Sequence, residues 1–289
     1  MIGSILNGYK VEARLRETGQ GTLYRAIDES GTLAAIFVLS EAASARPERR
    51  KAFLTGARTA LDLRHPNILK VIEVNDGDPF PYAIQELFES EDLKVTLWTR
   101  RDRIAGQEFY ILRQVAAALR HCHDHGIIHG DIKPENILVG ERATTKLTGF
   151  SLAQSAGSKI FKALFSRPVA GSPLYMSPEQ IQKKPLDPAS DVYSFGVVAY
   201  EVLTKRPPFL GTTPESIQDK HLSQLPPPMS NYLESPDSAL ESLLGRMLAK
   251  KPGERPMDWT QIIFELTNWE RKATQIRTLS TAPRDDRRN

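Results

Sequence analysis

Short runs of alternating apolar and polar residues dominate the first ninety positions of the chain. This alternation is typical of half-buried β-strands, and turn-forming residues at 28–31 and 75–79 separate some of the runs. One longer segment, 47–63, has helical spacing, with Pro47 near its start and His65-Pro66 after its end. The pattern therefore predicts a small antiparallel sheet with one main helix. The expected strands are 10–15, 22–27, 33–39, 68–74 and 82–87.

After about residue 100 the apolar spacing changes to the helical period. One stripe includes Ile111, Val115 and Leu119, and a second runs from Leu240 to Leu248. The segment 191–204 is apolar nearly all round, so we expect it to form a helix in the middle of a helical lobe. The pattern predicts an α+β protein with two unequal lobes.

The amino-acid composition and the net charge exclude several classes of protein. The 289 residues are 40% hydrophobic and 25% charged, close to globular averages, which argues for a folded soluble domain. Lys and Arg number 38 against 35 Asp and Glu, giving a net charge of +3. This balance is too even for a surface that neutralises many phosphates, so we expect no nucleic-acid partner.

Cysteine usage and the apolar runs suggest a location. The single Cys122 excludes an intramolecular disulfide and a multi-cysteine zinc site, which favours a reducing compartment. No apolar run approaches the roughly 18 residues of a membrane span, and the first ten residues lack the pattern of a secretion signal. We therefore expect a cytoplasmic protein, or the cytosolic portion of a longer membrane protein.

The segment 128–138, IHGDIKPENIL, carries the most specific motif. It resembles the catalytic loop of the protein kinase family, H-R-D-x-K-x-x-N. Gly149-Phe150-Ser151 then stands where D-F-G belongs, and Ser177-Pro178-Glu179 stands where A-P-E belongs. The resemblance covers about residues 9–268 and is strongest toward bacterial Ser/Thr kinases.

The resemblance implies a bilobal protein kinase fold that binds nucleotide between its lobes. The small antiparallel-sheet N-lobe would span about 9–88, and the larger, mostly helical C-lobe about 89–268. Residues 269–289 would form a basic polar tail, which we expect to be disordered or a linker.

The resemblance also assigns roles to framework residues. Glu179 and Arg255 match an ion pair that ties the activation segment to the helical lobe. Asp191 should brace the backbone of the catalytic loop, and His129 should stack with Phe150. We expect these residues to stabilise the C-lobe.

Three retained positions belong to the catalytic machinery of the family. Asp131 matches the candidate base, Lys133 follows it, and Asn136 matches a metal ligand. Phosphoryl transfer also needs phosphates held in line and metal ions that neutralise developing charge. These three residues are therefore retained but, by themselves, insufficient.

Three other positions depart from the family pattern. Phe37 stands at the position of the V-A-I-K lysine, Gly56 at that of its glutamate partner, and Gly149 at that of the metal-binding aspartate. If each of two missing electrostatic elements costs about 3 to 4 kcal/mol, the rate falls by roughly 10⁴ to 10⁶. We expect no metal site, no required cofactor, and ATP binding that is weak at most and independent of Mg²⁺.

The nucleotide site is reduced as well. The segment 16–21, RETGQG, keeps only the third glycine of G-x-G-x-x-G, and Arg16 or Arg25 could reach in as a replacement cation. An apolar slot of adenine size remains plausible. Its expected residues are Leu15, Leu23, Ala35, Gln85, Glu86, Leu87, Phe88 and Leu138, with the backbone of residues 86–88 offering hydrogen bonds.

These features favour a catalytically impaired Ser/Thr kinase-like domain, a pseudokinase, that serves as a signalling scaffold or allosteric binding module. The alternative is a weakly active or metal-independent Ser/Thr kinase that transfers the ATP γ-phosphate to protein hydroxyls. Expected partners are proteins, such as an active kinase, and a membrane only if the chain is part of a longer protein. The segment 155–168 mixes basic and apolar residues and is either a partner contact or a short helix on its own lobe.

Overall fold

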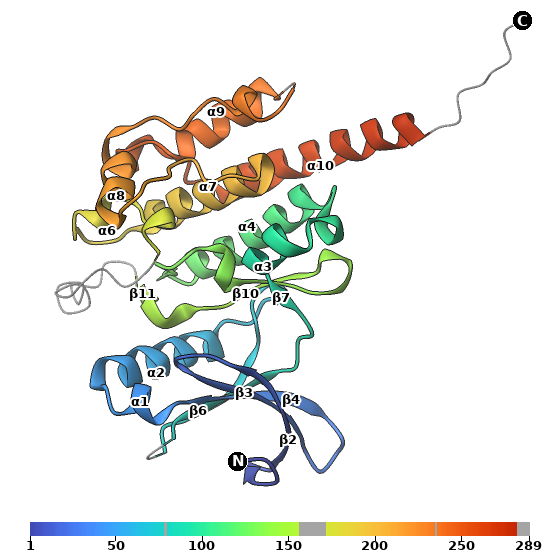
Figure 1. Cartoon of the computed structure of the whole chain (residues 1–289), viewed down its shortest axis with the longest axis vertical. Coiled ribbons are helices and arrows are strands. Elements are labelled where there is room, and N and C mark those ends of the chain that lie inside the picture. The colour runs from blue at the N-terminus through green and yellow to red at the C-terminus, as the bar shows by residue number, and fades with distance from the viewer. Residues whose placement is uncertain (78–79, 156–171, 235, 282–289) are drawn as a thin grey trace, which may run out of the picture.

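The N-terminal lobe is a curved antiparallel sheet of six strands in the order β1-β2-β3-β4-β6-β5 (Figure 1). The computed structural model describes residues 1–77, 80–155, 172–234 and 236–281. The helix α2 lies beside the sheet, on the side that faces the helical lobe. The elements of this lobe are β1 (Ile5–Leu6), β2 (Tyr9–Glu17), β3 (Gly21–Ile27), β4 (Leu33–Leu39), α1 (Glu41–Ser44), α2 (Pro47–Asp62), β5 (Val71–Asn75) and β6 (Tyr82–Glu86).

Alternation along β4 sorts its side chains between two faces of the sheet. Ala34, Ile36 and Val38 belong to the buried cluster of the N-lobe. Ala35 and Phe37 therefore point to the opposite face. The register places Ala35 opposite Gln85 of β6, and Phe37 between Leu23 of β3 and Ala83 of β6.

The C-terminal lobe is mostly helical, as the apolar period predicts. Its helices are α3 (Leu93–Thr99), α4 (Glu108–Asp124), α6 (Pro178–Ile181), α7 (Pro188–Thr204), α8 (Pro214–Ser223), α9 (Ser238–Met247) and α10 (Trp259–Thr281). Its short strands are β7 (Glu91–Asp92), β8 (Ile127–Ile128), β9 (Ile137–Val139), β10 (Thr145–Leu147) and β11 (Gln154–Ser155). They form a three-stranded sheet, β10-β9-β7, and a two-stranded one, β11-β8.

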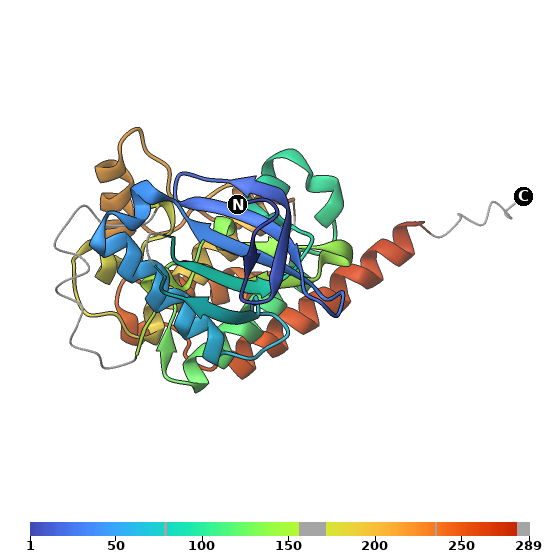
Figure 2. The same cartoon turned by 90° about the horizontal axis from the view of Figure 1, so that it is seen from below.

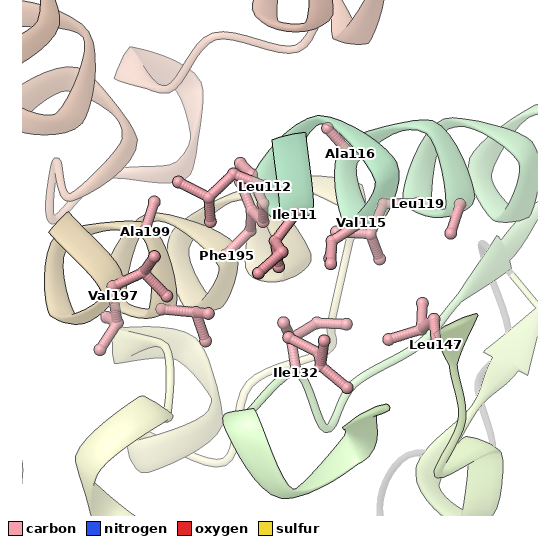
Figure 3. Close-up of a cluster of buried hydrophobic side chains, with 14 of the residues drawn as sticks. Ile111, Leu112, Val115, Ala116, Leu119, Ile132, Leu147, Phe195, Val197 and Ala199 are labelled. Carbon is pink, nitrogen blue, oxygen red and sulfur yellow. The ribbon is translucent and has the colours of Figure 1, made fainter. Parts of the chain in front are cut away.

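The core of this lobe is centred on α7, which is buried along nearly its whole length. Figure 3 shows apolar side chains of α4 and α7, among them Leu112 and Phe195, gathered with Ile132 and Leu147. The prediction of a central helix is confirmed. None of the helices in the described part of the chain has the length and apolar content needed to cross a membrane.

The helix α10 continues further than the sequence suggested. It runs to Thr281 and projects beyond the rest of the lobe (Figure 2). Trp269 is buried against Phe109 of α4, and the Glu270 carboxylate accepts a hydrogen bond of 2.9 Å from Arg113 Nε. These contacts stabilise the helix past residue 268, so the predicted tail is helical, not disordered, as far as Thr281. Residues 282–289 lie outside the described part of the chain.

Candidate active site between the lobes

The three retained catalytic positions contact one another. Lys133 Nζ lies 2.7 Å from Asp131 Oδ2. The Asn136 amide donates to the same oxygen at 2.8 Å and to the backbone carbonyl of Asp131 at 2.7 Å. The catalytic loop and the turn η2 (Pro134–Asn136) therefore bring together the residues that the motif predicts.

The Asp191 side chain anchors the backbone of the catalytic loop. Its carboxylate accepts the backbone N–H groups of His129 and Gly130, each at 2.8 Å. The carboxylate also accepts a hydrogen bond of 2.9 Å from His123 Nε2. The proton of His123 is on Nε2 because the other ring nitrogen accepts a hydrogen bond of 2.7 Å from Trp259 Nε1. Burial opposes ionisation of Asp191, but the hydrogen bonds that it accepts prevail and lower the pKa of its carboxyl group. The predicted brace is confirmed.

The His129 ring is fully enclosed behind the loop. Its Nε2 donates to the Thr148 carbonyl at 2.9 Å, and its Nδ1 accepts the Asp131 N–H at 3.2 Å. The ring lies 4.6 Å from that of Phe150, which confirms the predicted stacking. Burial lowers the pKa of His129, so the imidazole is neutral and both nitrogens are used in fixed roles.

The predicted ion pair between Glu179 and Arg255 is also present and buried. Arg255 Nη1 and Nη2 donate to the two carboxylate oxygens at 2.7 and 3.0 Å. Burial opposes ionisation of Glu179, but the hydrogen bonds and charge of Arg255 lower the pKa of its carboxyl group. The C-lobe therefore has the buried ion pair that the resemblance implies.

The space beside Gly149 is already filled. The glycine has a φ of +86°, and a Cβ placed on it would lie 2.3 Å from Asn136 Cγ. The Asn136 amide that holds Asp131 thus occupies the position where a side chain at 149 would begin. The described residues contain no group of three or more His, Cys, Asp or Glu side chains that could hold a metal ion.

Phe37 lies on the face of the sheet that carries the slot residues. Its ring packs against Phe53 of α2, with a centroid distance of 5.7 Å. A Cβ placed on Gly21 would lie 2.9 Å from Phe37 Cζ. The ring therefore lies under the hairpin that corresponds to the phosphate-covering loop, where a lysine at this position would reach toward phosphates.

Gly56 permits a close approach of α2 to the turn η4 (Phe150–Leu152). A Cβ at this position would lie 2.7 Å from the Phe150 carbonyl carbon and 2.8 Å from Ser151 N. Real Cβ atoms essentially never come this near to backbone atoms. In this arrangement there is no room for the glutamate that the family pattern places here.

The two candidate replacement cations are directed elsewhere. Arg25 Nε lies 3.1 Å from Glu12 Oε2 on the neighbouring strand. Arg16 Nη2 lies 3.1 Å from Asp92 Oδ2, so it links β2 to the residue that caps the start of α3. In this conformation each arginine is paired with a carboxylate, and a role as a relocated phosphate ligand stays a prediction.

The apolar slot is assembled in part. Ala35 and Gln85 lie opposite each other on the same face, while Leu23 and Leu138 are half-buried. Leu15 is 47% exposed and covers the slot only loosely.

Two slot residues direct their side chains away from the predicted cavity. The Phe88 ring lies against Gly140 and 5.5 Å from Lys146 Nζ. The Glu86 carboxylate accepts the Lys70 N–H at 2.8 Å and lies 2.9 Å from Lys146 Nζ. Residues 86–88, of which Leu87 directly follows β6, are therefore left with their backbone groups for the predicted slot.

Sequence reasoning missed a polar network in the C-lobe that links α3 to α7. Tyr175 Oη donates to Glu201 Oε2 at 2.6 Å, and Lys94 Nζ lies 3.3 Å from the other carboxylate oxygen. Burial, followed by the Glu201 charge, raises the pKa of Tyr175, so the hydroxyl remains a donor. The available signal was Glu201 itself, a charged residue inside a helix that is otherwise almost entirely apolar.

The segment predicted as a partner contact, 155–168, lies outside the described residues except for Ser155. Ser155 ends β11, which pairs with β8 beside the catalytic loop.

A curved sheet with one main helix, a helical lobe, and the loop of Asp131 to Asn136 at their junction are the features of a protein kinase domain. Residues 9–265 match the family described as protein kinase domain. The chain therefore belongs to the protein kinase family.

Bacterial proteins are among the relatives of the chain. A protein of Clostridium acetobutylicum named as a probable serine/threonine-protein kinase is 31% identical over 93% of this chain and 41% of its own length. The serine/threonine-protein kinases pkn3 and Pkn1 of Myxococcus xanthus are 32% and 31% identical, over 96% and 88% of this chain. Those matches cover 52% and 37% of the relatives, so the chain spans about half or less of each.

Proposed function

We propose that this kinase-family domain is a pseudokinase that acts as a binding or allosteric module for other signalling proteins. The observation that carries the proposal is the Phe37 ring, which lies on the cleft face beneath Gly21. An apolar ring there cannot neutralise phosphate charge, and it fills space that the phosphates need.

The other departures support the proposal because phosphoryl transfer depends on several parts at once. The metal-binding carboxylate is absent at Gly149, and Asn136 is committed to Asp131. The glutamate that would orient a lysine is absent at Gly56. When residues act as a unit, losing several leaves little of the rate.

The proposal includes the ligand properties of the domain. It requires no cofactor, and ATP binds weakly at most, without dependence on Mg²⁺. Base contacts remain in the slot, but the groups that would grip phosphates are missing. The braced catalytic loop and the Glu179–Arg255 pair supply a rigid framework on which protein partners could dock.

A weakly active or metal-independent Ser/Thr kinase is the second candidate. It is favoured by the contacts among Asp131, Lys133 and Asn136, which keep the candidate base in an ordered loop. The names of the relatives point in the same direction.

Phosphotransfer from labelled ATP, with and without Mg²⁺, separates the two candidates. The Asp131→Asn variant controls for contaminating kinases, because it changes one carboxylate oxygen and keeps the size of the side chain. We expect the same background signal from both proteins, toward generic acceptors and toward the chain itself. Robust turnover that Asp131→Asn abolishes would overturn the pseudokinase proposal in favour of the alternative.

A further inference from the structure

The ion pair between Arg16 and Asp92 connects the two lobes beside the predicted slot. Arg16 belongs to β2 of the N-lobe sheet, whereas Asp92 ends β7 and caps the start of α3 in the C-lobe. Arg16 Nη2 donates to Asp92 Oδ2 at 3.1 Å, although the two residues are 76 positions apart in the chain. The pair therefore links the hairpin of β2 and β3 to the helical lobe.

Strand register places each member of the pair beside a residue of the slot. Arg16 is directly opposite Leu23 of β3, and Asp92 is directly opposite Leu138 of β9. Residues that face each other on antiparallel strands extend their side chains from the same face of the sheet. Leu23 is an expected slot residue of the N-lobe, and Leu138 is one of the C-lobe. The ion pair therefore joins the two sides of the slot.

The two members of the pair differ in their freedom to move. The Asp92 side chain is only 6% exposed, and its other oxygen, Oδ1, accepts the Val95 N–H at 2.9 Å. The Arg16 side chain is 59% exposed. The carboxylate is thus held in place by α3, whereas the guanidinium can leave it for water. An ion pair with one fixed and one mobile member can open and close without disturbing the helix.

We propose that Arg16 and Asp92 form a clasp, an ion pair that restrains the opening of the two lobes and the entry of ligands into the slot. The role of the clasp in ligand entry rests on the proposed function, in which the slot keeps its base contacts. In the closed form the guanidinium holds the hairpin toward α3. In the open form the guanidinium turns to solvent and the hairpin lifts. A ligand that enters only the open form binds with an affinity reduced by the fraction of open molecules.

A second arginine of the N-lobe provides a matched control. Arg25 Nε lies 3.1 Å from Glu12 Oε2, the same distance as in the clasp, and the Arg25 side chain is 46% exposed. Both members of this pair belong to the N-lobe sheet, on β3 and β2. Arg16→Gln and Arg25→Gln therefore each remove one partly exposed ion pair, but only Arg16→Gln removes a link between the lobes.

The separation of the lobes can be measured without any nucleotide. One spin label is attached at Gly19→Cys in the hairpin, where an added Cβ meets nothing within 4 Å, and a second at Thr99→Cys, at the exposed end of α3. The buried Cys122 stays unlabelled. In pulsed electron paramagnetic resonance we expect a longer and broader distance distribution with Arg16→Gln, and no change with Arg25→Gln. Equal distributions with and without Arg16→Gln would overturn the proposal.

Binding of adenosine tests the effect on the slot, because this probe has the base but no phosphates. At low ionic strength we expect Arg16→Gln to bind adenosine about two- to fivefold more tightly than the unaltered chain, and Arg25→Gln to bind it equally well. In about 1 M NaCl the clasp is screened, so all three proteins should bind alike. Equal or weaker binding by Arg16→Gln at low ionic strength would overturn the proposal. Phosphotransfer by the unaltered chain would overturn the pseudokinase proposal alone, since neither measurement of the clasp involves a reaction.

Discussion

Gly56 has no side chain, and this allows α2 to approach the backbone of Phe150 and Ser151 closely. We expect Gly56→Ala to destabilise the protein by about 1 to 3 kcal/mol, because the added methyl group would collide with backbone atoms of Phe150 and Ser151. The free energy of unfolding in urea measures this change. Gly245→Ala is the matched control, since Gly245 lies in α9 with nothing within 4 Å of an added Cβ. That variant should gain up to about 1 kcal/mol from helix propensity, and an equal response of both variants would contradict the packing argument.

The Phe37→Lys variant introduces the lysine of the family pattern and tests whether this one change gives activity. We expect Phe37→Lys to remain inactive in phosphotransfer, because Gly56 and Gly149 still lack their carboxylates. It should also lose roughly 2 kcal/mol of stability, since an unpaired ammonium replaces a ring packed on Phe53. Phe37→Leu, which keeps an apolar group, should lose less. Measurable Mg²⁺-dependent turnover in Phe37→Lys would show that the other two losses are not limiting.

At the scale of elements, the attachment of α8 to α7 depends on a neutral histidine. The pKa of His221 is lowered to about 3 by burial and then by Lys250, so the unfolded chain binds a proton near pH 6.5 that the folded chain does not. Its contribution to stability is therefore complete above pH 6.5 and is lost as the pH falls below it, by about 2 kcal/mol at pH 5.

Urea unfolding at pH 7 and pH 5 measures this loss. The buried His129 shifts in the same direction, so the test compares variants. His221→Gln should be less stable at pH 7 but should lose less stability on acidification than the unaltered chain. Identical pH dependence in His221→Gln would contradict this account.

The sequence predicted most elements because their periods are strong. Strands β2 to β6 and helix α2 lie within a few residues of the expected positions, and α7 is central as its composition indicated. The motif also located Asp131, Lys133 and Asn136 correctly relative to one another. Contacts between distant segments that no family motif marks could not be predicted: Arg16 meets Asp92 across 76 positions, and Lys94 meets Glu201 across 107. The extension of α10 was missed for the same reason, since Trp269 is held by packing on α4.

At the scale of the whole molecule, the arrangement of the two lobes sets what can bind between them. We expect submillimolar ATP to leave the melting temperature nearly unchanged, with or without Mg²⁺, because a ligand far below its dissociation constant adds little stability. Differential scanning fluorimetry with ATP, ATP plus Mg²⁺, and ATP plus EDTA measures this. A rise of several degrees that grows with Mg²⁺ and disappears with EDTA would contradict the proposed loss of phosphate and metal binding.

The close packing of α2 on η4 also determines which single mutations could bring this chain closer to the family pattern. A single base change can convert a glycine codon to one for glutamate, so residue 56 is genetically near the family pattern. The Cβ of the new side chain would nevertheless clash with the backbone of Phe150. The helix α2 would have to move outward before the carboxylate could face the cleft. A change of Phe37 to lysine needs three base changes, because phenylalanine and lysine codons share no base. Introducing the family residues one at a time would therefore pass through less stable proteins that gain no charge pair, and selection for folding would work against each step.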